Sequence, residues 1–277
     1  MSERVVSQPS RKTCWVVDLG LVPYAPASEL QSRTVAARKR GDIPDTLLLC
    51  EHPHVITLGR NGKREHLKAA DGVLAQMNVE FHATDRGGDI TYHGPGQIVG
   101  YPILDLAAHK KDVRWYVEQI EEIMIRASAT FGVEAKRFED KHGIWVDTPN
   151  GEEKLAALGV HLSRWVTSHG FAYNATTSLN YFDLIVPCGI SGKRAASLER
   201  LLNRAVSRAE VAQALVTQFG EVFGSAIVPV TREEFAAALA ASEVSASAEA
   251  SNDLSHIAAS NSAELELAVS ASKGSEA

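Results

Sequence analysis

Apolar and polar positions alternate along this chain in short runs, and turn residues separate the runs. Apolar or β-branched runs of this kind are typical of strands that face a core. They predict strands at 13–19, 45–50, 55–58 and 98–104. Pro102 cannot donate a hydrogen bond to a strand ladder, so we expect the last of these strands to lie at a sheet edge or a bulge.

Two longer segments are typical of helices: 27–39 is rich in helix formers, and 113–131 repeats apolar residues with the helical period. The pattern predicts a helix at 27–39, closed by Gly41, and a helix at 113–131, closed by Gly132. The second segment has one wide apolar face, which is typical of a helix packed on a sheet.

Local turn and capping residues add three more predictions. Asn150-Gly151 lies between the strand-like runs 143–147 and 155–162, and Asn-Gly in that position is typical of a β-hairpin. Capping boxes at 207–210 and 231–234 predict the starts of two late helices.

The elements together predict one mixed α/β (α+β) domain with antiparallel hairpins. We expect this domain at 13–241, after a flexible N-terminus at 1–12. From Ser242 the chain is rich in Ala, Ser and Glu and lacks aromatic residues, so 242–277 is predicted to be a disordered tail. A single marginal helix at 262–269 is the alternative within that tail.

Composition narrows the choice of compartment and partner. The net charge of −6 argues against nucleic acid as the main partner. Three cysteines fit a reducing compartment better than a disulfide framework. No run approaches the ~20 apolar residues that span a bilayer. We therefore expect a cytoplasmic protein without a membrane partner, and a monomer.

The segment Arg86–Gln97 (RGGDITYHGPGQ) is the first candidate site. Its glycines allow a backbone to approach a ligand closely, while Tyr92 and His93 can wall a narrow slot. It precedes a strand and opens no helix, so it is neither a P-loop nor a dinucleotide fingerprint. A plain loop remains the alternative, and His93 could equally be a structural histidine.

Cys188 is the second candidate, in the run Pro187-Cys188-Gly189. The proline restricts the backbone before the thiol and the glycine leaves room beside it, which suits a presented nucleophile. A buried core cysteine is the alternative, and it is the interpretation we adopt for Cys14 and Cys50.

A thiol acts through its thiolate, so a helper that lowers its pKa is needed. The candidates are His93, His169 and Lys154. Lys154 follows the predicted hairpin turn and is either an exposed charge on the strand, paired with Glu152 or Glu153, or an ammonium beside the thiolate. His52 and His54 flank Pro53 but lack a companion cysteine or histidine at zinc-ligand spacing, so we assign no metal.

Five segments, in this order, resemble the octanoyltransferase family of lipoate biosynthesis, and the resemblance extends over about 13–224. They are 51–60, the segment Arg86–Gln97, 154–159, 168–172 and 187–190. The resemblance implies the fold of lipoate- and biotin-protein ligases, with no cofactor. It also implies transfer of an octanoyl group from octanoyl-acyl carrier protein to a lysine of lipoyl domains, in 2-oxoacid dehydrogenase complexes and the glycine cleavage H protein.

The resemblance also assigns residues. Cys188 would carry the acyl thioester and Lys154 would lower the pKa of its thiol, while His169 is a further candidate. The acyl contacts would be Arg86, Gly87, Gly88, Asp89, Ile90, Thr91, Tyr92, His93, Ala157, Leu158, Gly159, Gly170, Phe171 and Ala172.

Three rival functions remain open. An ATP-dependent lipoate-protein ligase would need no cysteine nucleophile. A Cys-dependent hydrolase would use His93 or His169 as its base. A non-catalytic acyl-binding protein would show no turnover.

Overall fold

The computed structural model describes residues 11–139, 141–186 and 194–248. The chain divides into two compact units, at 1–232 and 233–277, which are described separately. The predicted N-terminal segment 1–12 is described only for its last two residues, and Cys188 lies outside the described residues.

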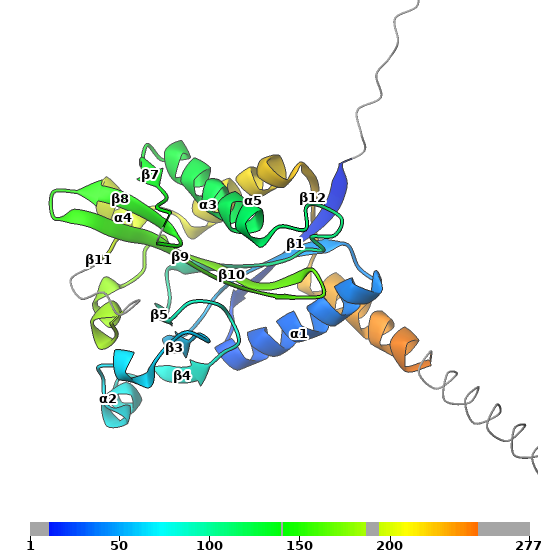
Figure 1. The fold of residues 1–277 in the computed structure, drawn as a ribbon, viewed down its shortest axis with the longest axis horizontal. Coiled ribbons are helices and arrows are strands. Elements are labelled where there is room, and N and C mark those ends of the chain that lie inside the picture. Colours follow the sequence, from blue (N-terminus) through cyan, green and yellow to red (C-terminus); the bar gives the residue numbers. More distant parts are fainter. Residues whose placement is uncertain (1–10, 140, 187–193, 249–277) are drawn as a thin grey trace, which may run out of the picture. The chain divides into compact units, whose positions relative to one another are not determined.

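A mixed sheet is the frame of the first unit (Figure 1). In the described residues its strand order is β12-β1-β2-β6-β10-β9-β8-β7, and β11 pairs with β9. Pairing is parallel from β12 to β2 and between β11 and β9, and antiparallel elsewhere. The strands are β1 Lys12–Leu21, β2 Asp45–Glu51, β6 Gln97–Ile103, β7 Ala135–Lys136, β8 Ile144–Thr148, β9 Gly151–Ser163, β10 Val166–Asn174, β11 Arg194–Ala195 and β12 Ser225–Pro229.

The expectation of a sheet edge or a bulge at Pro102 is wrong, because β6 is an inner strand whose register with β2 runs through Pro102 without a shift. β6 runs between β2 and β10, and Pro102 pairs with Leu47 of β2. The ladder to β10 ends at Gly100, and the Pro102 carbonyl accepts a hydrogen bond from the Thr167 hydroxyl on β10 at 2.7 Å. In an antiparallel ladder, the N and the C=O of one residue point toward the same neighbouring strand. The nitrogen of Pro102 therefore points toward β10 at a position beyond the end of the β6–β10 ladder, so its missing N–H removes no ladder hydrogen bond.

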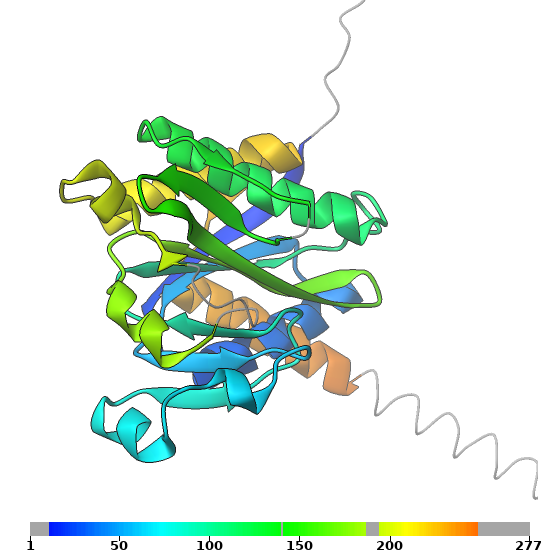
Figure 2. The same cartoon turned by 60° about the vertical axis from the view of Figure 1, so that its left-hand side comes forward.

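Helices cover both faces of this sheet (Figures 1 and 2). Helices α3 (Val113–Thr130) and α5 (Arg208–Phe223) lie on one face, and α1 (Tyr24–Arg40) lies on the other. α1 and α3 match the predicted helices, and Gly41 takes the left-handed φ of 85° that glycine tolerates at a helix end. α5 begins after Ser207 as predicted, although the Ser207 side chain makes no capping hydrogen bond. The short helices α2 (Asp71–Gln76) and α4 (Leu198–Leu202) and the 3-10 turns η1 (Arg64–His66) and η2 (Leu179–Leu184) complete the unit.

A second, three-stranded sheet lies on the α1 side of the frame (Figure 2). Its order is β4-β3-β5, with β4 at Glu80–Ala83, β3 at Val55–Leu58 and β5 at Ile90–His93. β5 lies inside the glycine-rich segment, so that segment is itself part loop and part strand. A separate hydrophobic cluster, which includes Ile56, Ile90, Tyr92 and Ile185, is the core of this sheet.

The predicted hairpin is confirmed. Thr148 pairs with Gly151, so Pro149 and Asn150 form its two-residue loop. Farther along, Ile144 pairs with Ala156 while Trp145 pairs with Lys154, so Leu155 is an extra residue on β9. Such a bulge re-aims the side chains beside it, and here it directly follows Lys154.

The second unit is described only over 233–248, where it continues a helix that begins at residue 232. The capping box at 231–234 therefore predicted this helix correctly. The helix continues through residue 248, so the first residues of the predicted tail, 242–248, are helical in the described structure. Residues 249–277, including the alternative helix at 262–269, lie outside the described residues.

Candidate active site

The glycine-rich loop rests on the frame through close backbone contacts. The Gly87 N–H donates to the Val160 carbonyl of β9 at 2.8 Å. A Cβ at Gly159 would lie 2.7 Å from the Gly87 oxygen, and one at Gly59 would lie 2.4 Å from the Gly88 oxygen. Glycines at 159 and 59 are therefore needed for the loop to lie this close to β9 and to the end of β3.

The predicted contact residues of β9 and β10 face one another across one ladder. Ala157 pairs with Ala172, Leu158 with Phe171, and Gly159 with Gly170. These six residues, with the Gly87 loop seated at Gly159 and Val160, bring two of the predicted groups together.

Gly170 leaves no room for a side chain in this ladder. A Cβ there would lie 2.2 Å from the Gly100 oxygen and 2.5 Å from Cδ of Pro102. We expect Gly170→Ala to lower the free energy of unfolding by about 3 kcal/mol, measured by urea denaturation. Gly72→Ala on α2 is the matched control: a Cβ there meets nothing within 4 Å, so its stability should stay equal or rise. Equal stability of the two variants would contradict the prediction.

The buried side chains around the loop form a chain of hydrogen bonds, in which each side chain accepts from the one before it and donates to the next. Arg86 donates to Thr57 Oγ1 at 2.9 Å, and that hydroxyl lies 3.3 Å from His93 Nε2. His93 Nδ1 lies 2.7 Å from Gln97 Oε1. Arg86 can only donate, so the Thr57 hydroxyl accepts from Arg86 and donates to His93 Nε2. The His93 proton is therefore on Nδ1, which donates to Gln97 Oε1, and both ring nitrogens have a partner.

This chain of hydrogen bonds continues from Gln97 to Ala196, in the segment that follows Cys188. Gln97 Nε2 donates to Asn174 Oδ1 at 2.9 Å, and Asn174 Nδ2 donates to the Ala196 carbonyl at 2.9 Å. The Ala196 N–H in turn donates to the Lys154 carbonyl at 2.8 Å. The glycine-rich segment is thereby linked to the strand that carries Lys154.

His93 is a neutral group in this setting. Burial, with the charges of its neighbours His52 and Arg86, lowers its pKa to about 3. It lies 6.5 Å from Tyr24 with the rings nearly parallel. At neutral pH it is therefore a hydrogen-bonding group rather than an available base.

This lowered pKa predicts a pH dependence of stability. The unfolded chain binds a proton at His93 near pH 6.5 and the folded chain only near pH 3, so stability rises with pH through that window and is flat above it. His93→Gln is expected to reduce the slope between pH 4 and 6 by about 1.4 kcal/mol per pH unit. Urea denaturation at several pH values measures the slope, and an unchanged slope would mean that His93 is protonated in the folded state.

Tyr92 is the centre of an aromatic stack. Its ring lies 5.1 Å from that of Tyr181 and 5.3 Å from that of Phe182, both on η2. Its hydroxyl lies 2.7 Å from His54 Nδ1. Ile90 and Tyr92 are thus core residues of the small sheet, while Thr91 pairs with Thr57 on the adjacent strand.

His169 is turned out of the regular strand pattern by its left-handed φ of 55°. Its Nε2 lies 2.7 Å from Asp85, and its N–H donates to Gln31 Oε1 of α1 at 2.8 Å. The neighbouring Ser168 instead donates to the His161 carbonyl. His169 therefore holds the start of the glycine-rich loop to β10, and burial lowers its pKa.

Lys154 is not a charge on an exposed edge. It lies on β9 between β8 and β11, where Trp145 and Ala195 are its pairing partners. The two carboxylates expected beside it have basic partners of their own. Glu153 is buried and bonded to Arg200, and Glu152 lies 3.5 Å from Lys141.

Both flanks of the stretch 187–193 are tied to the glycine-rich segment. Before it, the Val186 N–H donates to the His66 carbonyl at 2.7 Å, and the His66 ring lies 2.6 Å from Asp89. After it, Arg194 and Ala195 pair with Glu153 and Lys154. The chain therefore leaves the described structure beside the glycine-rich loop and returns beside Lys154.

Several residues of this arrangement were missed in the sequence: Thr57, Asp85, Asn174 and Trp145. Asp85 directly precedes the glycine-rich segment. Trp145 could have been found by counting, because a hairpin in which 148 pairs with 151 places 145 opposite 154. Thr57 and Asn174 have no local pattern that marks them.

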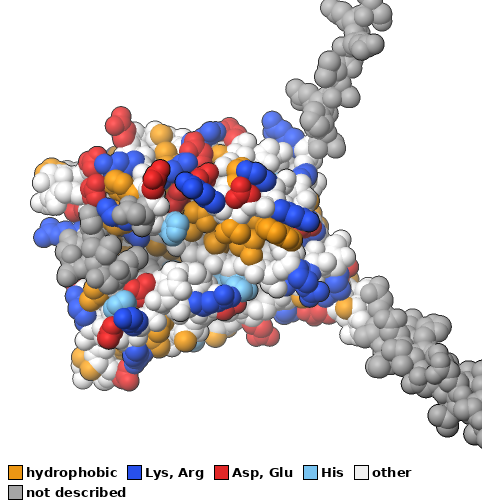
Figure 3. All heavy atoms as spheres, in the orientation of Figure 1, with side chains coloured by type: hydrophobic (Ala, Val, Ile, Leu, Met, Phe, Trp, Pro, Cys, Tyr) orange, Lys and Arg blue, Asp and Glu red, His pale blue; other side chains and the backbone are white. Residues whose placement is uncertain are grey.

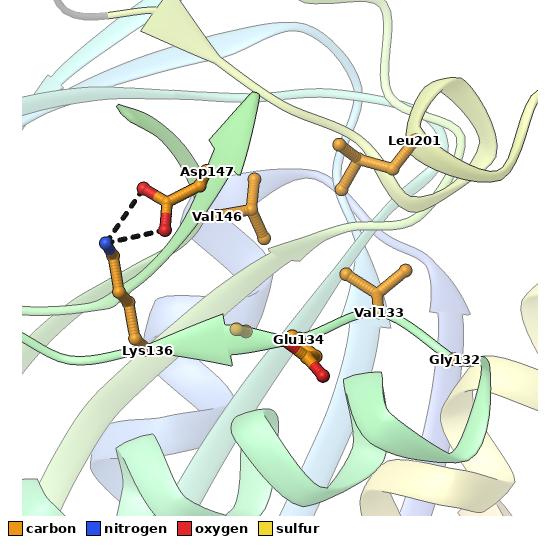
Figure 4. A pocket seen from close by; sticks show the side chains of 8 residues that line it. Gly132, Val133, Glu134, Lys136, Val146, Asp147 and Leu201 are labelled. Atoms are coloured by element: carbon orange, nitrogen blue, oxygen red, sulfur yellow. Dashed lines mark hydrogen bonds and ion pairs between the residues drawn. The ribbon is translucent and has the colours of Figure 1, made fainter. Parts of the chain in front are cut away.

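A surface pocket is formed by a different set of residues. One pocket is lined by Val133, Lys136, Val146, Asp147 and Leu201 among others, with Lys136 donating to both oxygens of Asp147 at 2.8 Å (Figure 4). None of its lining residues is a predicted site residue. On the face in Figure 3, acidic and basic side chains are interspersed around a stripe of hydrophobic ones.

Within 11–139, 141–186 and 194–248, no three His, Cys, Asp or Glu side chains are grouped to hold a metal ion. No helix in these ranges is long and apolar enough to cross a bilayer. Cys14 and Cys50 are buried, as predicted, and burial raises the pKa of both thiols.

The fold is that of the lipoyl protein ligase A/B catalytic domain, whose family model matches residues 23–220. A solved bipartite lipoate protein ligase from Thermoplasma acidophilum shares it, with a TM-score of 0.64 and 16% identity over 84% of this chain and 92% of that one.

Sequence similarity narrows the class further. The chain is 50% identical to the octanoyltransferase of Solibacter usitatus over 79% of its length and 96% of the relative. It is also 50% identical to that of Koribacter versatilis, over 75% and 83%. The chain therefore belongs to the octanoyltransferase family and is an acyltransferase of lipoylation.

Proposed function

We propose that this protein moves an octanoyl group from octanoyl-acyl carrier protein to a lysine of a lipoyl domain, through a thioester on Cys188. The observation that carries the proposal is that the glycine-rich segment is linked to both flanks of 187–193, through His66 to Val186 and through Asn174 to Ala196, and that the later flank pairs with Lys154. This arrangement favours a thiol and an ammonium that act together.

The first step forms the acyl-enzyme. The Lys154 ammonium stabilises the Cys188 thiolate by Coulomb attraction, and more strongly where water is excluded. The thiolate attacks the thioester carbonyl, the carrier's C–S bond breaks, and the carrier thiolate takes a proton from Lys154. The products are the free carrier thiol, octanoyl-Cys188 and neutral Lys154.

The second step forms the amide. The neutral amine of the acceptor lysine attacks the Cys188 thioester and gives its proton to neutral Lys154. The C–S bond breaks, so the thiolate and the ammonium are restored. His93 is excluded from this role because both of its ring nitrogens are hydrogen-bonded and its pKa is low. An amide is more stable than a thioester, so no ATP is consumed.

The contacts for the octanoyl chain are proposed to be Gly87, Gly159 and their neighbours on the β9–β10 ladder. Ala157 and Ala172, which pair across this ladder, are small residues next to the Gly159–Gly170 pair on which the loop is seated. A slim, unbranched acyl chain fits such a site.

Intact-mass spectrometry tests the proposal. The protein is mixed with octanoyl-acyl carrier protein without ATP, and an apo lipoyl domain is then added. We expect the enzyme to gain one octanoyl group and then lose it to the domain. Transfer that requires ATP and free octanoate would identify a ligase. Release of free octanoate despite the acceptor would identify a hydrolase, and no adduct and no transfer would identify a binding protein.

A further inference from the structure

Lys154 lies against the face of an aromatic ring. Its Nζ is 4.7 Å from the centroid of the Trp145 ring, within the range of a cation–π contact. The two residues are direct partners in the β8–β9 ladder. The bulge at Leu155 follows immediately and turns β9 at this point.

The indole itself is firmly placed. Trp145 is 3% exposed, and its Nε1 donates to the Lys141 carbonyl at 3.3 Å. Phe138 meets the ring edge-to-face with centroids 6.1 Å apart. On the other side of β8, Lys136 of β7 is its ladder partner. The strand pairing, the Phe138 contact and the hydrogen bond to the Lys141 carbonyl together fix the Trp145 ring. A fixed ring can support the flexible side chain of Lys154.

Several charged groups lie near this pair. Lys141 Nζ lies 5.8 Å from the same ring and 3.5 Å from Glu152. Glu153, next to Lys154 on β9, is bonded to Arg200 of α4. Arg194 of β11 pairs with Glu153 in the backbone ladder.

We propose that Trp145 is a positioning residue that holds the Lys154 ammonium for the Cys188 thiolate. This inference rests on the proposed function of Lys154. A contact with a carboxylate adds a negative charge beside an ammonium, whereas a contact with an indole adds none. The face of an indole attracts a cation while carrying no net charge, so this contact can hold the ammonium without opposing its positive field.

The test compares Trp145→Leu and Trp145→Phe with wild type. Leucine removes the ring and phenylalanine keeps a smaller one. We expect the rate of acyl-enzyme formation at pH 7 to fall about 3- to 30-fold in Trp145→Leu and less in Trp145→Phe. The pH profile of Cys188 alkylation by iodoacetamide should move upward in the same order. Trp115→Leu is the matched control, because it removes a partly buried indole on α3 and leaves the profile in place.

A second measurement does not depend on the variants folding. In wild-type protein, the ring current of Trp145 should shift the Lys154 Hε resonances upfield relative to a free lysine. Ordinary shifts for these protons would overturn the inference, even if Trp145→Leu is unfolded.

The two proposals fail in different ways. If Lys154→Ala leaves the alkylation profile of wild type unchanged, the role of Lys154 is wrong. If Lys154→Ala moves the profile while a folded Trp145→Leu does not, Lys154 is placed by other groups and the role of Trp145 is wrong.

Discussion

The Cys188→Ser protein is expected to gain no octanoyl group from octanoyl-acyl carrier protein, and to transfer at least about a thousandfold more slowly than wild type. A serine hydroxyl stays protonated beside an ammonium, whereas a thiol becomes a thiolate. Intact-mass spectrometry of the two proteins, side by side, measures the adduct.

Stability separates loss of the nucleophile from loss of the fold. Cys188→Ser should unfold at the same urea concentration as wild type, because one small polar atom replaces another. A variant that is folded and still transfers at near wild-type rate would rule out the covalent intermediate.

Lys154→Ala is expected to slow octanoyl transfer about 100- to 10,000-fold at pH 7. Loss of the ammonium removes the charge that favours the thiolate, so the apparent pKa of the Cys188 thiol should rise toward about 8.5, the value of a free cysteine. The rate of alkylation should therefore fall at pH 7 and recover as the pH rises past that value. The measurement is the rate of Cys188 labelling by iodoacetamide from pH 5 to 10.

Lys154→Arg distinguishes the two roles of the lysine. Arginine keeps a positive charge but does not release a proton in this pH range. We expect it to restore much of the alkylation profile while transfer to the lipoyl domain stays slow. Equal recovery of both activities would assign the proton transfer to another group.

Local sequence patterns located several elements of the first unit. β2 and β3 follow from short apolar runs between prolines and glycines, and α3 follows from one apolar face. The β8–β9 hairpin follows from Asn150-Gly151. These elements are set by contacts between near neighbours in the chain, which a local pattern records.

The predictions that failed depend on distant neighbours. Pro102 is an edge residue by its local chemistry, yet it lies inside the sheet because its missing N–H falls beyond the end of the β10 ladder. Glu153 is the sequence neighbour of Lys154 and was expected to be an exposed partner for it. In the structure Glu153 is buried and bonded to Arg200, which lies 47 positions away.

The sequence by itself determined the mixed α/β class, the family, and the residue types that octanoyl transfer would need. Only the tertiary structure decided how they meet. Asp89, Gln97 and Asn174 link the glycine-rich segment to both flanks of 187–193, and Trp145 supports Lys154. The reason is physical: these bonds join segments that are far apart along the chain, and their geometry exists only once the sheets have packed.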